Sequence, residues 1–530
     1  MASPRPRASS KAAAPSAPRT DPDAAARPPS PIDRAWAVGA TILTVALAAW
    51  LLTCLVVQAA AGFFYTDECF HAYAAEWIAR HGRLPVVFPE FYSGLAYYYP
   101  PLLHLIGAGC LKLFGSGSLH QVNVALFGLL LVAVALPIVP GMAWTPRRWA
   151  VLLLVASHWL AVYAVRLYVE MLISLLAFVA IMLLERFHRT QRRRDAAWLG
   201  VVAGLALVTK HTAIVLPLGI AACAVGSAMA RDRGRSHGYL VALAIALAIA
   251  IPFFVRNAVL YGSPFYPLFA RDSNVEVWRL NVQAYSLAPL AFYRSALESF
   301  GAPVLGMTAA ALALAAWRRR WTVATAVMLG GLAVLIVGGL TPLHDTRHTM
   351  PLVPLLALAA SATVWAAVER QPRLQRIIEA GLLVIAAVIV VRIGYLRAGV
   401  DLPPPLEAAY AAIRERTPPE AKILSVWTYD TAYYTHCKAT WPIPWSQRER
   451  SFELFYERDP DRFLAMLRQY HIDFVLLPSI RPPPVFNGMN YPRSFMDCVE
   501  TLGKRGALRI VWRSKTLIFI GVNDDAPATP

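Results

Sequence analysis

The sequence predicts an all-α polytopic membrane domain of about eleven to thirteen transmembrane helices, followed by a small α/β domain. Of the 530 residues, 57% are apolar and only 15% are charged, whereas soluble proteins carry about 25% charged residues. Long apolar runs recur throughout residues 35–397. Beyond them, the pattern changes to short segments that alternate between helical and strand periodicity.

The net charge of +18 does not indicate nucleic-acid binding, because apolar membrane chains carry excess Lys and Arg in their cytoplasmic loops. Residues 1–34 are basic and rich in Pro, Ala and Ser. Such a segment has too little apolar area to offset chain entropy, which predicts a disordered cytoplasmic tail. The run from Trp36 to about Ala60 is long enough to cross the membrane and has no signal-peptide cleavage pattern.

A polar and aromatic external loop, 59–96, follows this first span. Further apolar spans are expected to centre near residues 105, 131, 157, 177, 203, 220, 247, 309, 331, 360 and 386. Three loops between them are rich in arginine and should be cytoplasmic by the positive-inside rule: 186–194, 231–235 and 318–320. This assignment places the C-terminus outside.

The loop assignment contains one inconsistency. It places Asp67 and Arg166 on the same, external side, yet three apolar segments lie between them. An odd number of crossings cannot return the chain to the same side. One of the three segments is therefore expected to be short, re-entrant or wrongly delimited.

Residues 398–530 predict a soluble extracytoplasmic α/β domain. Its elements are expected as helices over 407–416 and 459–470, and as strands over 422–427, 473–477, 508–512 and 516–522. Cys437 and Cys498 both fall in this domain. A disulfide between them is a hypothesis, because an external compartment permits oxidation.

Two acidic residues, Asp67 and Glu68, follow the first span directly. A solvated turn would explain them equally well if they stood alone. The same loop ends in three tyrosines that lead into the next apolar segment: Tyr97, Tyr98 and Tyr99. An aromatic belt at the membrane interface is the alternative explanation for these rings.

A second ionisable pair, Arg166 and Glu170, lies between two apolar runs. Charged groups at membrane depth are costly and usually mark a functional site or a buried pair. The spacing of four residues also suits a purely structural ion pair on one helix face. Both interpretations stay open at this point.

Five cationic or titratable residues are expected on the external side: Lys210, Arg256, His344, Arg347 and His348. Each of them alone could be a side chain that extends to the membrane interface. Together they depart from the positive-inside rule, so they need another explanation. A phosphate group on a lipid would supply it, because Arg and Lys bind phosphate through charge-assisted hydrogen bonds.

These motifs, taken in order, resemble a known family. The sequence has Asp67-Glu68 after the first span, the run Tyr97 to Pro101, the pair Arg166 and Glu170, the stretch Gly204 to Lys210 and the late Arg347-His348. This order resembles the C-type fold of integral-membrane glycosyltransferases that use polyprenyl-phosphate sugars. The similar bacterial members are the protein O-mannosyltransferases and the aminoarabinose transferase of lipid A. His71, where such members often carry Tyr, and Glu170, where many carry Asp, depart from the pattern.

The resemblance implies transfer of a hexosyl or pentosyl group from a polyprenyl-phosphate sugar, with inversion. The acceptor would be a hydroxyl of an envelope glycolipid, glycan or protein. Asp67 would be the base and Glu68 its support, and the five cationic residues would bind the donor phosphate. Arg166, Glu170 and the tyrosines 97–99 would line the substrate cavity. Nothing in the sequence demands a metal or another cofactor, although Glu68 and Glu170 could bind a divalent ion.

Other functional classes stay open. A secondary transporter or a flippase would share the many spans and the intramembrane charges. It would not be expected to append an external domain or to place its acids in the first loop. A lipid-linked polymerase or ligase is a neighbouring kind of enzyme, and a binding protein would leave the external cations unexplained. In each case the expected location is multi-pass in a cell membrane, with the bacterial inner membrane favoured.

Overall fold

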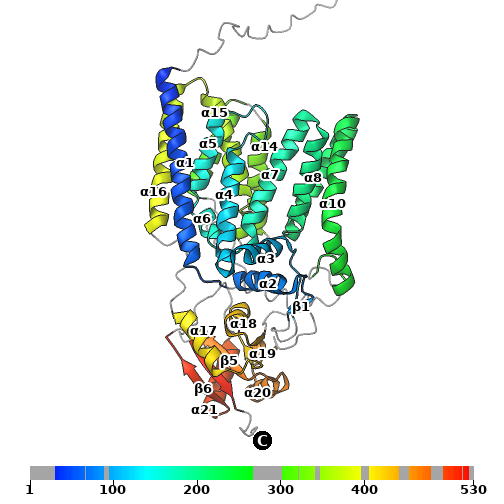
Figure 1. The fold of residues 1–530 in the computed structure, drawn as a ribbon, viewed down its shortest axis with the longest axis vertical. Coiled ribbons are helices and arrows are strands. Elements are labelled where there is room, and N and C mark those ends of the chain that lie inside the picture. The colour runs from blue at the N-terminus through cyan, green and yellow to red at the C-terminus, as the bar shows by residue number, and fades with distance from the viewer. Residues whose placement is uncertain are drawn as a thin grey trace, which may run out of the picture.

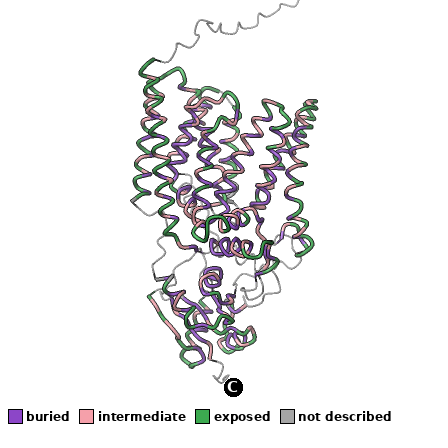
Figure 2. Tube along the Cα trace, in the orientation of Figure 1, coloured by how far each residue is buried: buried purple, intermediate pink, exposed green. Residues whose placement is uncertain are grey.

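The computed structural model places a bundle of helices above two helices that lie across its lower end, with an α/β domain below them (Figure 1). It describes the following residues: 30–65, 67–88, 95–266, 301–319, 322–340, 346–395, 405–425, 427–440, 453–478, 493–515 and 517–523. Buried residues gather inside the bundle, and exposed ones line its outer helices (Figure 2). Many exposed residues of α1, α10 and α16 are large and apolar, as expected of surfaces that face lipid.

Most helices belong to the bundle. These are α1 (Pro31–Ala60), α4 (Val122–Ala135), α5 (Trp144–Val155), α6 (His158–Ala164), α7 (Val169–Thr190), α8 (Arg193–Leu207), α9 (Val215–Met229), α10 (Arg233–Tyr261), α13 (Ala302–Trp317), α14 (Val323–Leu340), α15 (Leu352–Val368) and α16 (Pro372–Tyr395). Short 3₁₀ helices precede three of them: η1 (Ser116–Gln121), η2 (His211–Ile214) and η3 (Thr346–Thr349).

The expected number of spans is not reached among the described residues. Five segments are long and apolar enough to cross a membrane: Pro31–Ala60, Ser116–Ala135, His211–Met229, Arg233–Tyr261 and Pro372–Gly394. The bent pair of α6 and α7 makes a possible sixth. Several other apolar helices have 17 residues or fewer, whereas about 20 are needed to cross 30 Å of hydrocarbon.

Helix α1 begins before the predicted tail ends. Ser30 caps it by accepting a hydrogen bond from the Asp33 backbone N–H at 3.1 Å, and Pro31 occupies the first turn. A serine cap, a proline at the first position and an acid in the first turn all favour a helix start. The boundary predicted at residue 34 was therefore a few residues late.

The segment expected to span near residue 105 does not cross the bundle. It forms α3 (Leu102–Phe114), whose 13 residues extend about 20 Å. Helix α3 lies beside α2 (Asp67–His81) under the bundle (Figure 1). The two helices pack closely at Gly107, where an added Cβ would lie 3.0 Å from the Ala75 Cβ. With this segment removed from the count, Asp67 and Arg166 return to one side.

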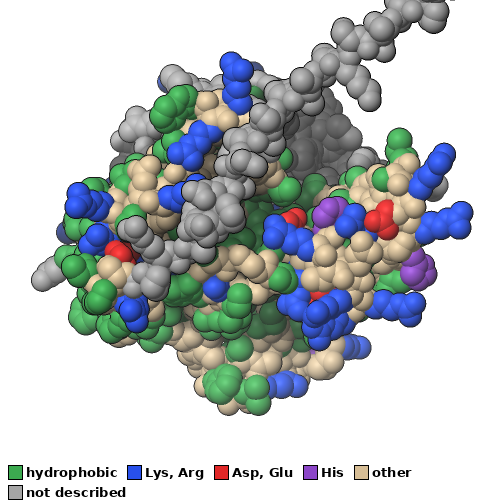
Figure 3. All heavy atoms as spheres, turned by 90° about the horizontal axis from the view of Figure 1, so that it is seen from above, with side chains coloured by type: hydrophobic (Ala, Val, Ile, Leu, Met, Phe, Trp, Pro, Cys, Tyr) green, Lys and Arg blue, Asp and Glu red, His purple; other side chains and the backbone are tan. Residues whose placement is uncertain are grey.

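Basic side chains gather on the bundle face opposite the α/β domain (Figure 3). The segments 186–194 and 231–235 lie where α7 meets α8 and where α9 meets α10, and Arg318 and Arg319 follow α13. Tight packing brings α8 against α10 within this part of the bundle. A Cβ at Gly200 would lie 2.5 Å from the Ala242 carbonyl oxygen, and one at Gly204 would lie 2.9 Å from the Ile249 Cβ. Small residues let the two helix backbones approach closely.

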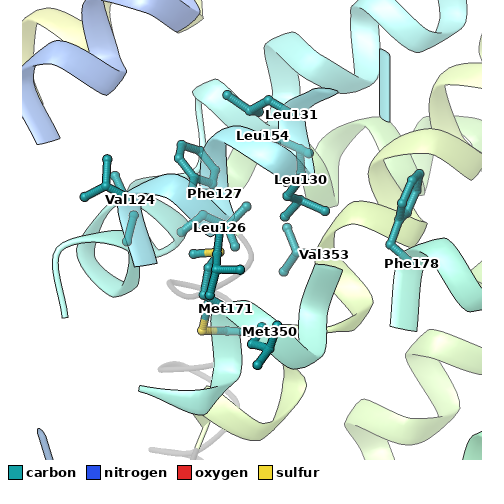
Figure 4. Close-up of a cluster of buried hydrophobic side chains, with 14 of the residues drawn as sticks. Val124, Leu126, Phe127, Leu130, Leu131, Leu154, Met171, Phe178, Met350 and Val353 are labelled. Atoms are coloured by element: carbon teal, nitrogen blue, oxygen red, sulfur yellow. The ribbon is translucent and has the colours of Figure 1, made fainter. Parts of the chain in front are cut away.

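The bundle core lies where α4, α5, α7 and α15 meet (Figure 4). Phe127 and Leu130 from α4, Leu154 from α5 and Met171 from α7 are each fully buried or nearly so. Val353 of α15 completes this contact (Figure 4). The core ties the acid-bearing start of α7 to the start of α15.

A buried ion pair joins α1, α5 and α16. Arg148 Nε donates to Glu379 Oε1 at 2.6 Å, and both side chains are at most 3% exposed. Trp36 Nε1 donates to the other carboxylate oxygen at 2.8 Å, and Arg148 also donates to the Ala37 carbonyl at 3.0 Å. These extra hydrogen bonds satisfy groups that would otherwise be buried without partners.

The C-terminal domain contains a five-stranded sheet in the order β4-β3-β5-β7-β6. Strand β3 pairs in parallel with β4 and β5, whereas β7 is antiparallel to β5 and β6. The strands are β3 (Lys422–Leu424), β4 (Lys438–Thr440), β5 (Phe474–Pro478), β6 (Leu508–Arg513) and β7 (Leu517–Val522). The helices are α17 (Pro405–Arg416), α18 (Thr428–Thr435), α19 (Glu453–Tyr456), α20 (Pro460–Gln469) and α21 (Arg493–Lys504).

The expected α/β domain is thus confirmed, and each of its predicted helices and strands overlaps an observed one. Helices α18, α19 and α21 and strand β4 were not predicted. The hypothesis of a disulfide between Cys437 and Cys498 was wrong, because both thiols are free. Cys437 Sγ instead lies 3.6 Å from the Pro418 carbonyl oxygen, and Cys498 Sγ lies 3.7 Å from that of Glu457.

The Arg148–Glu379 pair generates a prediction about stability. Arg148→Met leaves Glu379 as an uncompensated buried charge, which should cost about 3–5 kcal/mol. We expect a clear fall in the apparent melting temperature, measured by scanning fluorimetry in detergent. The double variant Arg148→Met/Glu379→Met removes both charges and should recover most of the loss. A double variant as unstable as the single one would contradict this explanation.

Candidate active site

Asp67 and Glu68 begin α2 and contact different partners. Asp67 Oδ2 accepts a hydrogen bond from Arg347 Nη1 at 2.7 Å, and its side chain is 29% exposed. Glu68 is buried: Oε1 accepts from the Leu167 backbone N–H at 2.8 Å, and Oε2 lies 3.5 Å from Arg166 Nη1. Of the two neighbouring acids, only Asp67 is open to a substrate.

Glu170 brings three cationic or titratable side chains to the same place. Its Oε1 accepts from Lys210 Nζ at 2.7 Å and lies 3.9 Å from Arg347 Nε and 3.8 Å from His348 Nδ1. Lys210 Nζ also lies 2.9 Å from His348 Nδ1. We call Asp67, Glu170, Lys210, Arg347 and His348 the charge cluster. Of the five cationic or titratable candidates, the structure brings Lys210, Arg347 and His348 together.

Breaks in the helices position these side chains. Glu170 lies in the first turn of α7, after Tyr168 adopts an extended conformation with φ −115° and ψ 153°. The chain bends there by 118° between α6 and α7. Lys210 is the extended residue before η2, and Arg347 lies in η3. Irregular backbone at membrane depth is tolerated where it is buried in protein or lines a cavity.

The bend separates two residues that sequence spacing had paired. The structural alternative of an Arg166–Glu170 pair was wrong, because residues 165–168 are not helical and the four-residue spacing has no meaning there. Arg166 contacts Glu68 instead, and Glu170 contacts Lys210. Glu68 and Glu170 thus each have their own cation.

Among the described residues, no group of three His, Cys, Asp or Glu side chains could hold a metal ion, and metal dependence stays open.

Arg256 belongs to a different arrangement. Its guanidinium donates to the Pro85 carbonyl and to Asn257 Oδ1, and it lies 5.6 Å from the centre of the Tyr97 ring. Tyr261 donates to the Val86 carbonyl at 2.6 Å. The end of α10 therefore holds the loop between α2 and α3. A phosphate-binding role for Arg256 stays a prediction, and His344 lies outside the described residues.

The tyrosines before α3 have separate partners. Tyr97 is fully buried and its hydroxyl lies 2.6 Å from His104 Nδ1. The Tyr98 hydroxyl lies 3.2 Å from that of Tyr429, and the Tyr99 ring lies 5.0 Å from the His71 ring. All three are packed inside the protein near α2 rather than spread along a membrane interface.

Helix α18 fixes the C-terminal domain against α2. Tyr433 donates to Glu76 Oε1 at 2.7 Å, and Tyr434 donates to the Phe64 carbonyl at 2.8 Å. The Phe63 and Tyr434 rings stack with centroids 4.0 Å apart. The segment that carries Asp67 is thus held between the bundle and the C-terminal sheet domain.

Two buried histidines near the charge cluster were missed as site residues. His71 lies one turn after Asp67 on α2, and His104 lies on α3. His104 interrupts an apolar segment, which was a usable signal, but that segment was interpreted as a span. Tyr168 was also missed as a contact: its ring lies 5.4 Å from the Arg347 guanidinium carbon.

Burial changes the protonation of Glu68. Desolvation raises the pKa of its carboxyl to about 7, although Arg166 and the backbone N–H groups of Leu167 and Tyr65 favour the anion. Glu68 therefore titrates near neutral pH. Because both of its carboxylate oxygens are already engaged by Arg166 and by backbone N–H groups, Glu68 is suited to hold the loop.

Comparison with known proteins supports the fold described above. Residues 99–255 match the family described as dolichyl-phosphate-mannose-protein mannosyltransferase. ArnT from Cupriavidus metallidurans bound to undecaprenyl phosphate superimposes with a TM-score of 0.62 and 15% identity, over 93% of this chain and 100% of that one. AglB, the oligosaccharyltransferase of Archaeoglobus fulgidus, gives 0.63 and 12% identity, over 89% of this chain and 73% of that one.

A search of curated protein sequences gives no match. The matches found confirm the resemblance to C-type-fold glycosyltransferases, and at these identities the structural likeness shows the fold.

The pKa of Glu68 generates a second prediction. Its folded-state value of about 7 lies above the ordinary 4.5, so the folded protein holds this proton more tightly and loses stability as pH rises from 4.5 to 7. The loss amounts to about 3 kcal/mol. Glu68→Gln cannot titrate, so its melting temperature relative to wild type should rise over this range. Glu420→Gln, at an exposed acid paired with Lys438, is the control and should show no such trend. The prediction would be contradicted if the difference in melting temperature between Glu68→Gln and wild type did not change with pH.

Proposed function

We propose that the protein transfers a glycosyl group from a polyprenyl-phosphate-linked sugar to a hydroxyl of an envelope glycolipid, glycan or protein. The observation that carries the proposal is the partly exposed Asp67 carboxylate beside Arg347, Lys210 and Glu170. A reaction of this kind needs a base for the acceptor hydroxyl and cations for the departing phosphate. The charge cluster offers both within one group of contacts.

Asp67 is assigned as the base. Its Oδ2 binds Arg347, and among the described residues Oδ1 makes no hydrogen bond, so this oxygen can accept the acceptor's proton. The acceptor oxygen then bonds to the anomeric carbon, and the bond from that carbon to the phosphate oxygen breaks with inversion. The proton stays on Asp67, and the bonding electrons leave with the lipid phosphate.

The charges of the cluster balance during this step. Before reaction, Arg347 and Lys210 are compensated by Asp67 and Glu170. Proton transfer neutralises Asp67 at the moment when the leaving phosphate gains a negative charge. The positive charge of Arg347 then becomes available to the phosphate, with Lys210 and His348 beside it. Charged groups arranged in advance of the reaction stabilise such a transition state most effectively.

Glu170 is assigned to the substrate cavity. Its Oε1 holds Lys210, whereas Oε2 is buried and has no hydrogen-bond partner among the described residues. A buried carboxylate oxygen without a donor is costly. A hydroxyl of the donor sugar would supply the missing hydrogen bond.

The proposed orientation has the N-terminus in the cytoplasm and the C-terminal domain outside. Its support is the gathering of Lys and Arg on the face opposite that domain (Figure 3) and the arginine-rich turns between bundle helices. The charge cluster lies at the other end, by the start of α2, and α2 packs against α18. The structure of ArnT bound to undecaprenyl phosphate shares this fold.

Asp67→Asn is the direct test of the base. The amide keeps the size of the side chain but cannot take a proton, so kcat should fall by about 10²–10⁴ while polyprenyl phosphate still binds. Turnover of lipid-linked sugar by purified protein measures it. Asp461→Asn is the matched control, because Asp461 also binds an arginine at 2.7 Å but lies in the C-terminal domain. Turnover by Asp67→Asn within about threefold of wild type would exclude Asp67 as the base, given that a base contributes about 10² or more.

The orientation is tested by reporter fusions. Alkaline phosphatase folds to an active form only outside the cytoplasm, so a fusion after Pro530 should be active. A fusion within the turn from α7 to α8 should be inactive. The reverse pattern would overturn the assignment of the two faces.

A further inference from the structure

A buried chain of hydrogen bonds leads toward the charge cluster and has no role in the reaction as proposed. The Tyr97 hydroxyl lies 2.6 Å from His104 Nδ1, and His104 Nε2 lies 2.7 Å from His71 Nδ1. The three residues are at most 1% exposed. They come from the segment before α3, from α3 and from α2, so the chain depends on the packing of these two helices.

Both imidazoles are neutral. Burial lowers the pKa of His71 to about 4 and holds that of His104 well below its usual range. The groups of the cluster act on His71 in opposite directions: Asp67 and Glu170 favour its charged form, and Arg347 and Lys210 disfavour it. A neutral imidazole has one N–H donor and one bare nitrogen, so the chain must have a direction.

Tyr97 sets that direction. Among the described residues, His104 is the one hydrogen-bond partner of its hydroxyl. If the hydroxyl accepted a hydrogen bond, its own proton would be buried without an acceptor, which is costly. Tyr97 therefore donates to His104 Nδ1. The cation of Arg256, 5.6 Å from the Tyr97 ring centre, also makes the phenol a better donor.

The remaining protons follow from this step. With Nδ1 accepting, His104 carries its proton on Nε2 and donates it to His71 Nδ1. His71 must then carry its own proton on Nε2. Its position one turn after Asp67 places it on the same helix face as that acid. Because Nδ1 is engaged by His104, the Nε2 edge is the part of the ring left for a ligand.

We infer that His71 is a further substrate-binding residue, whose Nε2–H donates a hydrogen bond to an oxygen of the lipid-linked sugar phosphate. The inference rests on the proposed function. His104 and Tyr97 are positioning residues that act through His71 by fixing its tautomer. A neutral donor suits this place, because a phosphate or sugar oxygen accepts hydrogen bonds and the charge cluster already contains two carboxylates. The same geometry argues against His71 as a base, since a base would need a bare Nε2.

Amide substitutions distinguish a donor at Nε2 from a residue that only fills space. The amide nitrogen of glutamine can take the place of Nε2, whereas that of asparagine corresponds to Nδ1. His71→Phe and His71→Asn should weaken binding of the donor by about ten- to a hundredfold, the usual effect of losing a hydrogen bond to a charged group. His71→Gln should stay within about fivefold of wild type. Equal effects of the Gln and Asn variants would overturn the inference.

Two ligands identify the accepting oxygen. Weaker binding of undecaprenyl phosphate in detergent by His71→Phe would assign it to the phosphate. A raised KM for the complete sugar donor, with unchanged binding of the phosphate alone, would assign it to the sugar. No change in either measurement would exclude His71 as a contact. Failure of wild-type protein to bind undecaprenyl phosphate at all would instead count against the proposed function.

The tautomer can be observed without any activity. Nitrogen-15 NMR of the histidine-labelled protein, with His71 assigned from the spectrum of His71→Gln, should show a protonated Nε2 and a bare Nδ1. Tyr97→Phe removes the group that sets the direction and should add signal from the other tautomer. Tyr239→Phe is the matched control, because that buried tyrosine contacts His188 at 3.1 Å in another part of the bundle. A wild-type His71 protonated on Nδ1 would overturn the inference.

Discussion

Compensation of buried charge is the constraint on which this structure depends. Each strongly buried carboxylate among those discussed above has a cation within reach: Glu68 has Arg166, Glu170 has Lys210, and Glu379 has Arg148. An isolated ion in such surroundings costs several kcal/mol, so removal of either partner destabilises the other. These pairs join segments far apart in the chain, and they fix how the helices meet. The Glu379 pair is closed by tryptophan and backbone groups on three helices. The charge cluster is more open, because Asp67 and Arg347 keep part of their surface exposed.

That difference in exposure separates structural acids from the reactive one. Glu68 and Asp67 are neighbours, yet their surroundings assign them opposite tasks. Glu68 is enclosed by backbone N–H groups and Arg166, and its raised pKa reflects the cost of that enclosure. Asp67 binds a single described partner, and that partner is itself a candidate ligand of the substrate. Before reaction, the two carboxylates of the cluster compensate Arg347 and Lys210. When Asp67 takes a proton, the positive charge of Arg347 becomes available to a phosphate that gains charge during reaction.

The two helices below the bundle, α2 and α3, carry residues of the site and also connect the bundle to the C-terminal domain. Helix α2 carries Asp67, Glu68 and His71 on one side and receives α18 of the sheet domain on the other. Helix α3 packs beside it and supplies His104. Because α18 contacts α2 and the segment before it through tyrosine hydroxyls and stacked rings, the C-terminal domain supports the segment that carries the proposed base. The C-terminal domain is therefore part of the framework of the site.

The sequence by itself determined the fold class, because apolar runs and strand alternation are local properties of a chain. It also singled out Asp67, Glu170, Lys210 and Arg347 as candidates, since ionisable groups stand out in apolar surroundings. Only the tertiary structure decided which acid meets which cation. Arg347 is 280 residues from Asp67, and no spacing rule applies over such a separation. Hydropathy could not show that α3 lies flat, because a buried apolar helix and a short span have the same composition. Helix α18, rich in Thr and Tyr, lacks a helical signature and forms where packing against α2 stabilises it. The His71–His104 contact likewise arises only when α2 and α3 are packed together.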